Sequence, residues 1–188
     1  MTNYTIIGII SGLLSVFAYI PYITSIYKKK IQPHPFSWFL WAVLGFATFI
    51  TYIGVGAKET LPLALISFVG PMIIFFLTFK YWKRGFPKFD YFCLFIAIVA
   101  IIIYVVFHQA EIALTLSLVS DLFTALPTIR KTYKDPSSEN FWTWFLFALG
   151  AVFALFAIRD FTYGVLIFPL YLTVFEIIMC ILILRKKY

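Results

Sequence analysis

The sequence predicts an all-α membrane protein in which seven transmembrane helices form two parallel three-helix repeats joined by a linker helix. Three observations support this fold class: the apolar composition, the uneven distribution of basic residues and an internal repeat. Of the 188 residues, 63% are hydrophobic and only 12% are charged, and the mean hydropathy is +0.97. A chain this apolar cannot cover itself with polar surface in water, so a soluble globular domain and a disordered segment are both excluded.

Seven stretches are long and apolar enough to cross a bilayer. A hydrocarbon core about 30 Å thick needs roughly 20 apolar residues per helix, with about 17 to 25 tolerated. The first stretch follows no Lys or Arg and exceeds the apolar run of a signal peptide, so we expect it to remain in the mature protein. The predicted helices cover residues 4–27, 35–56, 61–79, 91–107, 111–129, 141–158 and 163–184.

Basic residues fall mainly on one side of the predicted membrane. The segments after the first, third and fifth helices and the C-terminus carry thirteen Lys and Arg residues, whereas the N-terminus and the other loops carry only Lys58 and Arg159. Because basic residues near helix ends stay in the cytoplasm, we expect the N-terminus outside and the C-terminus in the cytoplasm. The same distribution accounts for the net charge of +7, so no nucleic-acid partner is needed to explain it.

The chain contains an internal repeat with an offset of 106 residues. Within positions 21–44, eight of the 24 residues recur at the shifted positions, where this composition would give roughly two by chance. Two such triplets fused directly would run in opposite directions, and one added span restores the same direction. We therefore predict a first repeat over 1–84, a linker helix within 85–108 and a second repeat over 109–188. The identical pairs are Pro21–Pro127, Ile23–Ile129, Tyr27–Tyr133, Lys28–Lys134, Trp38–Trp144, Phe39–Phe145, Leu40–Leu146 and Ala42–Ala148.

This organisation resembles the PQ-loop superfamily, which includes the SWEET sugar facilitators and the cystinosin-type lysosomal transporters. The resemblance covers the whole chain and rests on the three-plus-one-plus-three plan, the external N-terminus and a proline before a short basic loop in each repeat. These prolines are Pro21 and Pro127, followed by Tyr22 and Thr128 where the family name refers to glutamine. The resemblance implies transport of a small solute by alternating access between the repeats.

Two acidic residues lie inside apolar runs. Asp121 and Glu176 are ten and thirteen residues beyond the starts of the fifth and seventh predicted helices, at 111 and 163. A carboxylate near the bilayer centre costs about 2.5 to 3.5 kcal/mol on insertion scales, so such residues normally face the bundle interior and have a function. Burial disfavours the charged form of a carboxyl group, so protonation during a transport cycle is compatible with both residues. We predict that both bind substrate or carry protons.

Other polar residues form stripes on the first, fifth and seventh predicted helices. On the fifth helix the spacing i, i+4, i+7 places Ser117, Asp121 and Thr124 on one face. Three stripes at comparable depth predict one central cavity between the repeats. Alternatively, serine and threonine hydroxyls bond the preceding helical turn or allow close packing. Beside the two acids, the candidate substrate-binding or proton-coupling residues are Ser15, Tyr19, Ser117, Thr124 and Thr173.

Prolines and tryptophans mark further positions of interest. Pro21, Pro127 and Pro71 each remove a backbone hydrogen bond inside a predicted helix, and each is either a hinge or a kink without motion. In the resembling family, such prolines are associated with hinging. The tryptophans near the cytoplasmic ends of the second and sixth helices are typical of an aromatic belt at the lipid headgroups. They are Trp38, Trp41, Trp142 and Trp144.

We predict a transporter of a small polar solute, such as a sugar, amino acid, amine or vitamin-like compound. The chain has no Gly-rich phosphate loop, zinc-type His/Cys spacing or nucleophile elbow, so we expect no enzyme activity, cofactor or metal. Asp121 would either contact a cationic or hydroxyl group or couple transport to protons. The alternative is a non-transporting PQ-loop membrane receptor or assembly factor. We expect a multi-pass protein of the plasma membrane, which in bacteria is the inner membrane, with the solute and membrane lipid as partners and the oligomeric state left open.

Overall fold

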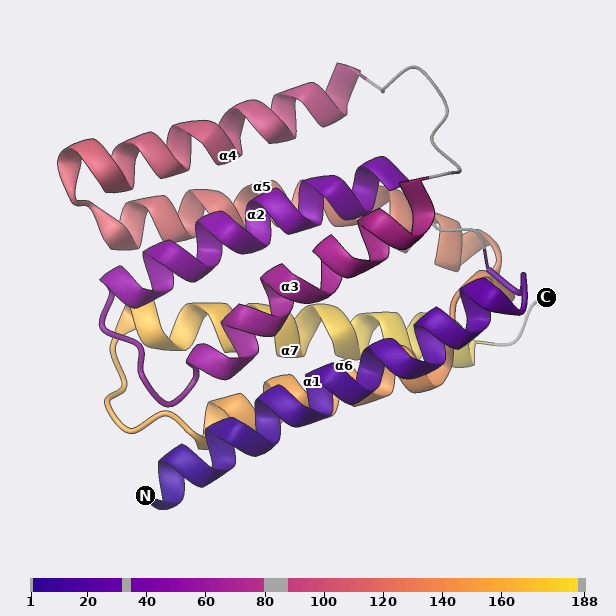
Figure 1. Cartoon of the computed structure of the whole chain (residues 1–188), viewed down its shortest axis with the longest axis horizontal. Helices are drawn as coiled ribbons and strands as arrows, with labels where there is room; N and C mark the ends of the chain where they lie inside the picture. Colours follow the sequence, from indigo (N-terminus) through magenta and orange to yellow (C-terminus); the bar gives the residue numbers. More distant parts are fainter. Residues whose placement is uncertain (1, 32–34, 80–87, 186–188) are drawn as a thin grey trace.

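The structure is a computed structural model that describes residues 2–31, 35–79 and 88–185. Within these ranges the chain forms seven α-helices, one 3₁₀ turn (η2, Pro136–Ser138) and no strand, so the predicted all-helical fold is confirmed (Figure 1). The helices are α1 (Asn3–Tyr27), α2 (Pro35–Gly54), α3 (Leu61–Thr78), α4 (Lys88–Phe107), α5 (Ala110–Lys134), α6 (Phe141–Phe156) and α7 (Tyr163–Leu184).

The helices form a bundle suited to lipid. Five of those described, α1, α2, α3, α5 and α7, are long and apolar enough to cross a membrane, while α6 has 16 residues and the apolar part of α4 covers Leu94–Phe107. Large apolar side chains such as Phe17, Phe95 and Val174 are more than half exposed on the outside of the bundle. Hydrocarbon accommodates such a surface, and water does not. The chain is therefore a multi-pass helical membrane protein.

The helix ends match the sequence patterns at most places, and α5 is the main exception. It continues to Lys134, five residues beyond the predicted end at 129. Pro127 does not terminate it, because a proline removes only one hydrogen bond of the ladder, and basic residues are favourable at a helix C-terminus. The predicted basic positions Lys80, Lys83 and Arg84, the repeat boundary at 84 and the basic positions 186–187 lie outside the described residues.

Polar caps fix the starts of the second-half helices. The side chain of Asn140 accepts a hydrogen bond from the Thr143 amide at the start of α6 (3.2 Å), and Thr162 accepts one from the Val165 amide at the start of α7 (3.4 Å). Each cap satisfies one of the free N–H groups of a first helical turn, a contribution of about 1 kcal/mol. The caps thereby set where the two helices enter the bundle.

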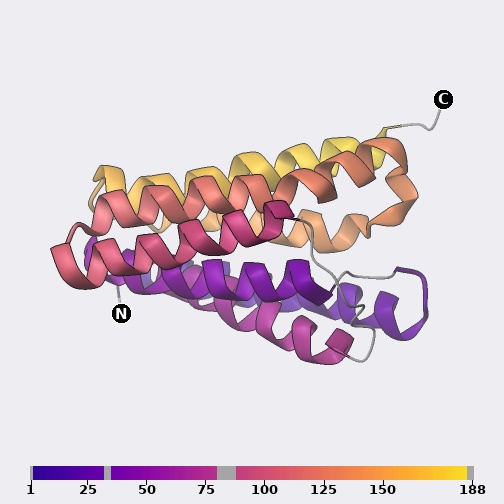
Figure 2. The same cartoon turned by 90° about the horizontal axis from the view of Figure 1, so that it is seen from above.

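The helices lie in two layers, with α1–α3 in one and α5–α7 in the other (Figure 2). Within each layer the third helix packs between the other two: α3 contacts α1 and α2, and α7 contacts α5 and α6. Across the layers α1 packs along α6 and α2 along α5. The remaining helix, α4, contacts both α5 and α2, so it lies across the junction between the layers. The start of α1 and the end of α7 lie at opposite ends of the bundle (Figure 1).

Small residues allow the closest helix contacts. A Cβ atom added at Gly45 of α2 would lie 2.4 Å from the backbone oxygen of Ser67 in α3. Between the layers, the Ser11 hydroxyl of α1 donates a hydrogen bond to the backbone oxygen of Gly150 in α6 (2.7 Å). In a bilayer, where lipid is as apolar as leucine, such close packing and interhelical hydrogen bonds hold helices together.

The Gly45 contact predicts the effect of a single methyl group. Gly45→Ala should separate α2 from α3 and destabilise the protein by about 1–3 kcal/mol, as overpacking does. For a chain of this size that lowers the melting temperature by about 2–4 °C per kcal/mol. Thermal unfolding in detergent measures the change in melting temperature. Val119→Ile, which adds one carbon to an exposed side chain of α5, is the control. Equal melting temperatures for both variants would contradict the close contact between α2 and α3 at Gly45.

Candidate functional site

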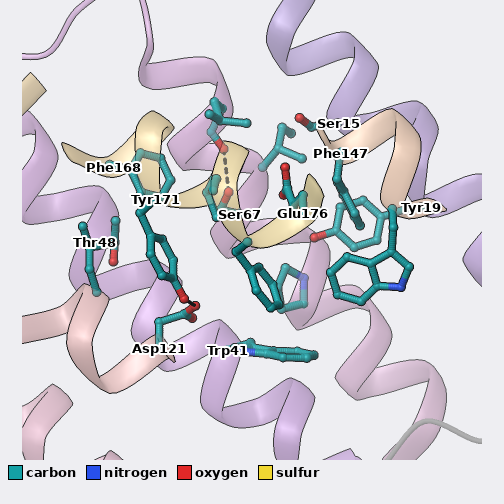
Figure 3. Close-up of a pocket in the computed structure, with 18 of the residues that line it drawn as sticks. Ser15, Tyr19, Trp41, Thr48, Ser67, Asp121, Phe147, Phe168, Tyr171 and Glu176 are labelled. Atoms are coloured by element: carbon teal, nitrogen blue, oxygen red, sulfur yellow. Dashed lines mark hydrogen bonds between the residues drawn. The ribbon is translucent and has the colours of Figure 1, made fainter. Parts of the chain in front are cut away.

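A cavity of about 100 Å³ lies between the two layers (Figure 3). Side chains from every described helix except α4 line it. It lies near the middle of the bundle, since Ser15 and Asp121 are close to the centres of α1 and α5. The cavity brings together four of the seven candidate binding residues and one candidate hinge, namely Ser15, Tyr19, Asp121, Glu176 and Pro71.

Asp121 is held by a tyrosine from the neighbouring helix. The Tyr171 hydroxyl of α7 donates a hydrogen bond of 2.6 Å to Oδ2 of Asp121 on α5 (Figure 3). Asp121 remains partly exposed, and both residues line the cavity. Sequence reasoning missed Tyr171, because it lies outside the polar stripe that places Thr173 and Glu176 on one face of α7. The sequence alone does not show whether a tyrosine in an apolar run places its hydroxyl in a ligand site or only packs its ring against other helices.

Glu176 is the most unusual group of the site. Its residue is 6% exposed, and its Oε2 atom is buried without a hydrogen-bond partner among the described residues. Both Glu176 and Asp121 line the cavity. Leaving a buried polar group unpaired costs about 1–3 kcal/mol, and more when it is charged. Because most buried polar groups in proteins have a hydrogen-bond partner, the Oε2 atom of Glu176 is an unusual feature of this bundle.

The other three candidate residues do not reach the cavity. Ser117, Thr124 and Thr173 are buried, and each donates its hydroxyl hydrogen to the backbone oxygen four residues earlier, at 2.7–3.0 Å. This is the alternative described above for hydroxyls on apolar helices. Ser15 makes the same local bond, to Ser11 at 3.0 Å, although it also lines the cavity.

Aromatic side chains form most of the cavity wall. Trp38 and Trp144 are each 6% exposed, and Trp41 packs against the apolar clusters around both of them. Trp142, by contrast, is 62% exposed, which suits the aromatic belt expected for all four tryptophans. The other aromatic lining residues are Tyr19, Phe147, Phe168, Tyr171 and Phe175. The repeat could have identified Trp38 and Trp144, because they occupy equivalent positions in the two halves.

A polar network at the α5–α6 connection positions Trp144. Its indole N–H donates to Oε2 of Glu139 (3.2 Å), while Lys131 donates to Oε1 of the same carboxylate (2.6 Å). Nearby, the Asn140 amide donates to the Ser25 hydroxyl of α1 (3.1 Å). These contacts fix one wall of the cavity and join the two layers at this end of the bundle.

The opposite end, which holds the N-terminus, contains one apolar cluster that includes both layers. Tyr52 is fully buried at its centre, donates a hydrogen bond to the Val165 backbone oxygen (2.7 Å) and shares one with Thr60 (2.8 Å). Leu63, Leu118 and Phe168 belong to this cluster and also line the cavity. The cluster therefore packs between the cavity and this end of the bundle.

The candidate hinge prolines occupy different surroundings. All three lie inside helices: Pro21 in α1, Pro71 in α3 and Pro127 in α5. Pro71 is buried against the cavity, whereas Pro127 is exposed beside Arg130 and Lys131 at the basic end of α5. The Ser25 hydroxyl donates to the backbone oxygen of Pro21 (2.7 Å), the same kind of local bond that Ser15 makes.

Comparisons with known protein families, with curated proteins and with solved structures find no match for this chain. The functional proposal therefore depends on the cavity and its two carboxyl groups.

Uncharged substitutions at Tyr171 and at Glu176 should change the stability of the protein in different directions. Tyr171→Phe removes the donor of Asp121 and should lower stability by about 1–3 kcal/mol. Glu176→Gln replaces an unpartnered carboxyl by an amide, which costs less to bury than a carboxylate, so stability at pH 8 should stay equal or rise. Melting temperatures of the ligand-free protein test both, and a clear loss in Glu176→Gln would show that Glu176 has a stabilising partner.

Proposed function

We propose that the protein is a membrane transporter of a small polar solute that works by alternating access. The observation that carries the proposal is the cavity at mid-depth between the layers, into which Asp121 and Glu176 project. Placing two carboxyl groups inside an apolar bundle is costly, and a polar cavity with a ligand or proton pathway is the usual reason for keeping them. Solute binding at the interface of two repeats near the bilayer midplane is common among transporters.

We also propose that the seven helices are two parallel three-helix repeats joined by α4, as in the PQ-loop superfamily, with the N-terminus outside. The helix contacts support this, because each contact in one triplet has its equivalent in the other. The pair α1–α3 corresponds to α5–α7, and α2–α3 corresponds to α6–α7. The cross-layer pair α1–α6 likewise corresponds to α5–α2. On this assignment Tyr52 lies at the external end and Trp144 at the cytoplasmic end.

The two ends of the cavity support alternating access. At the external end one apolar cluster joins residues of both triplets around Tyr52. At the cytoplasmic end each triplet has a cluster of its own, one around Trp38 and one around Trp144, and Trp41 packs against both. This is the arrangement expected when the triplets are closed together outside and less firmly joined inside.

A panel of labelled sugars, amino acids, amines and vitamins tests transport in proteoliposomes, with protein-free vesicles as control. We expect uptake of at least one class. If transport is proton-coupled, Asp121→Asn should abolish uptake driven by a pH gradient and leave counterflow exchange, because asparagine can still accept the Tyr171 hydrogen bond and cannot titrate. Unchanged gradient-driven uptake would refute the coupling. Flux of no solute would favour the receptor or assembly-factor alternative.

The proposed closure of the external end predicts a second result. Tyr52→Phe removes two hydrogen bonds from the cluster that joins the triplets and should favour opening at this end. A cysteine at Leu118, in a chain with both native cysteines replaced by serine, should then react faster with an impermeant maleimide added outside. Tyr163→Phe is the matched control, since its hydroxyl shares an exposed hydrogen bond with Thr115. Equal labelling rates in the two variants would contradict this closure.

A further inference from the structure

The charge of the cavity wall is entirely acidic. Asp121 and Glu176 line it, and none of the described lining residues is lysine, arginine or histidine. Asp121 already accepts the Tyr171 hydrogen bond, whereas Oε2 of Glu176 is buried and unpartnered. The site therefore lacks a positive charge. A ligand carrying a carboxylate or phosphate would add negative charge beside two acids and meet no cationic partner.

The remaining wall suits an organic cation better than a metal ion. Aromatic faces attract cations through the negative face of the ring, and tryptophan does so best. Trp41 packs edge to face on Trp38 (5.0 Å between centroids), and Trp144 does so on Phe175 (5.5 Å). The described residues contain no group of three or more metal-ligating side chains, and hard metal ions require several oxygen ligands.

The two serine hydroxyls that line the cavity already donate hydrogen bonds. The hydroxyls of Ser15 and Ser67 both line the cavity, and each donates its hydrogen to the backbone oxygen four residues earlier (3.0 Å). An uncharged polyol would leave the two carboxyl groups without a counter-ion. A compact cation would instead interact with the Oε2 atom of Glu176, which has no hydrogen-bond partner among the described residues.

We propose that the cavity binds a small organic cation without a carboxylate, such as an amine or a quaternary ammonium compound. The positively charged nitrogen lies between Glu176 and Asp121, and the apolar substituents contact the rings of Trp41 and Phe147. This inference rests on the proposed function, because it assigns the substrate class of the same cavity.

Choline and two close analogues test the charge requirement on the purified full-length protein. 3,3-Dimethyl-1-butanol has the shape of choline without the charge, and glycine betaine keeps the quaternary ammonium and adds a carboxylate. Tryptophan fluorescence and calorimetry give the dissociation constants. We expect choline to bind at least ten times more tightly than either analogue. Equal affinity for choline and the neutral alcohol, or no binding of choline by either method, would overturn the proposal.

Matched variants locate the binding. Glu176→Gln should weaken choline binding at least tenfold and leave binding of the neutral alcohol unchanged, while Glu111→Gln, an exposed acid at the start of α5, should change neither. Trp41→Leu should weaken choline binding, whereas Trp142→Leu on the exposed face should not. Because Glu176→Gln is an isosteric change, its melting temperature and its neutral-ligand binding show whether the fold is intact. Equal effects of the cavity and surface variants would place the cation elsewhere and overturn the proposal.

Counterflow of labelled choline distinguishes failure of the proposed cation site from failure of the proposed transporter. Binding with counterflow supports both the cation site and the transporter. Binding without any solute flux supports the cation site and overturns the transporter. Flux of a sugar or amino acid without choline binding overturns the cation site and leaves the transporter standing.

Discussion

A carboxyl group at the middle of a bilayer must face protein, and this constraint organises the bundle. Asp121 and Glu176 lie on α5 and α7, so both helices must turn these faces inward. The Tyr171 hydrogen bond satisfies Asp121 within the same helix pair. Among the described residues the Oε2 atom of Glu176 has no such donor, and Glu176 lines the cavity. The outer surface can then consist of apolar side chains, as the lipid requires.

The two halves supply different parts of the site, although their helices pack alike. At the offset of 106 residues, Asp121 corresponds to Ser15 and Glu176 corresponds to Gly70. A Cβ atom at Gly70 would lie 2.0 Å from the Tyr19 ring, so a tyrosine fills the space in the first half that a carboxyl side chain uses in the second. One half therefore provides the charge, and the equivalent positions in the other half provide an aromatic wall and a small hydroxyl.

The sequence predicts the helices well, and the structure places both acids beside the cavity, because length, apolarity and the cost of buried charge are local properties. It predicts the remaining site less completely. The stripe that contains Ser117 and Thr124 identifies one face of α5. Each of these hydroxyls, however, donates to a backbone oxygen of its own helix, so its position on this face does not show that it lines a cavity. Tyr171 and Trp41 become site residues only through helices distant in the sequence. The predicted end of α5 is wrong, because the sequence does not show how far the basic, solvated segment after Pro127 continues as helix.

The hydrogen bonds at the two ends of the cavity differ in kind, and this difference bears on how the bundle can open. At the end that holds the N-terminus, Tyr52 bonds a backbone oxygen of the opposite layer inside an apolar cluster, where the bond is shielded from water. At the other end, the buried Ser25 hydroxyl and the half-buried Asn140 side chain join the layers by one hydrogen bond, and the exposed part of Asn140 can exchange this partner for water at lower cost. Separation of the layers is therefore easier beside Trp144 than beside Tyr52. In the proposed transport cycle, a ligand that reaches Glu176 from the tryptophan-lined end would meet the weaker barrier, and opening of the other end would require the Tyr52 cluster to separate.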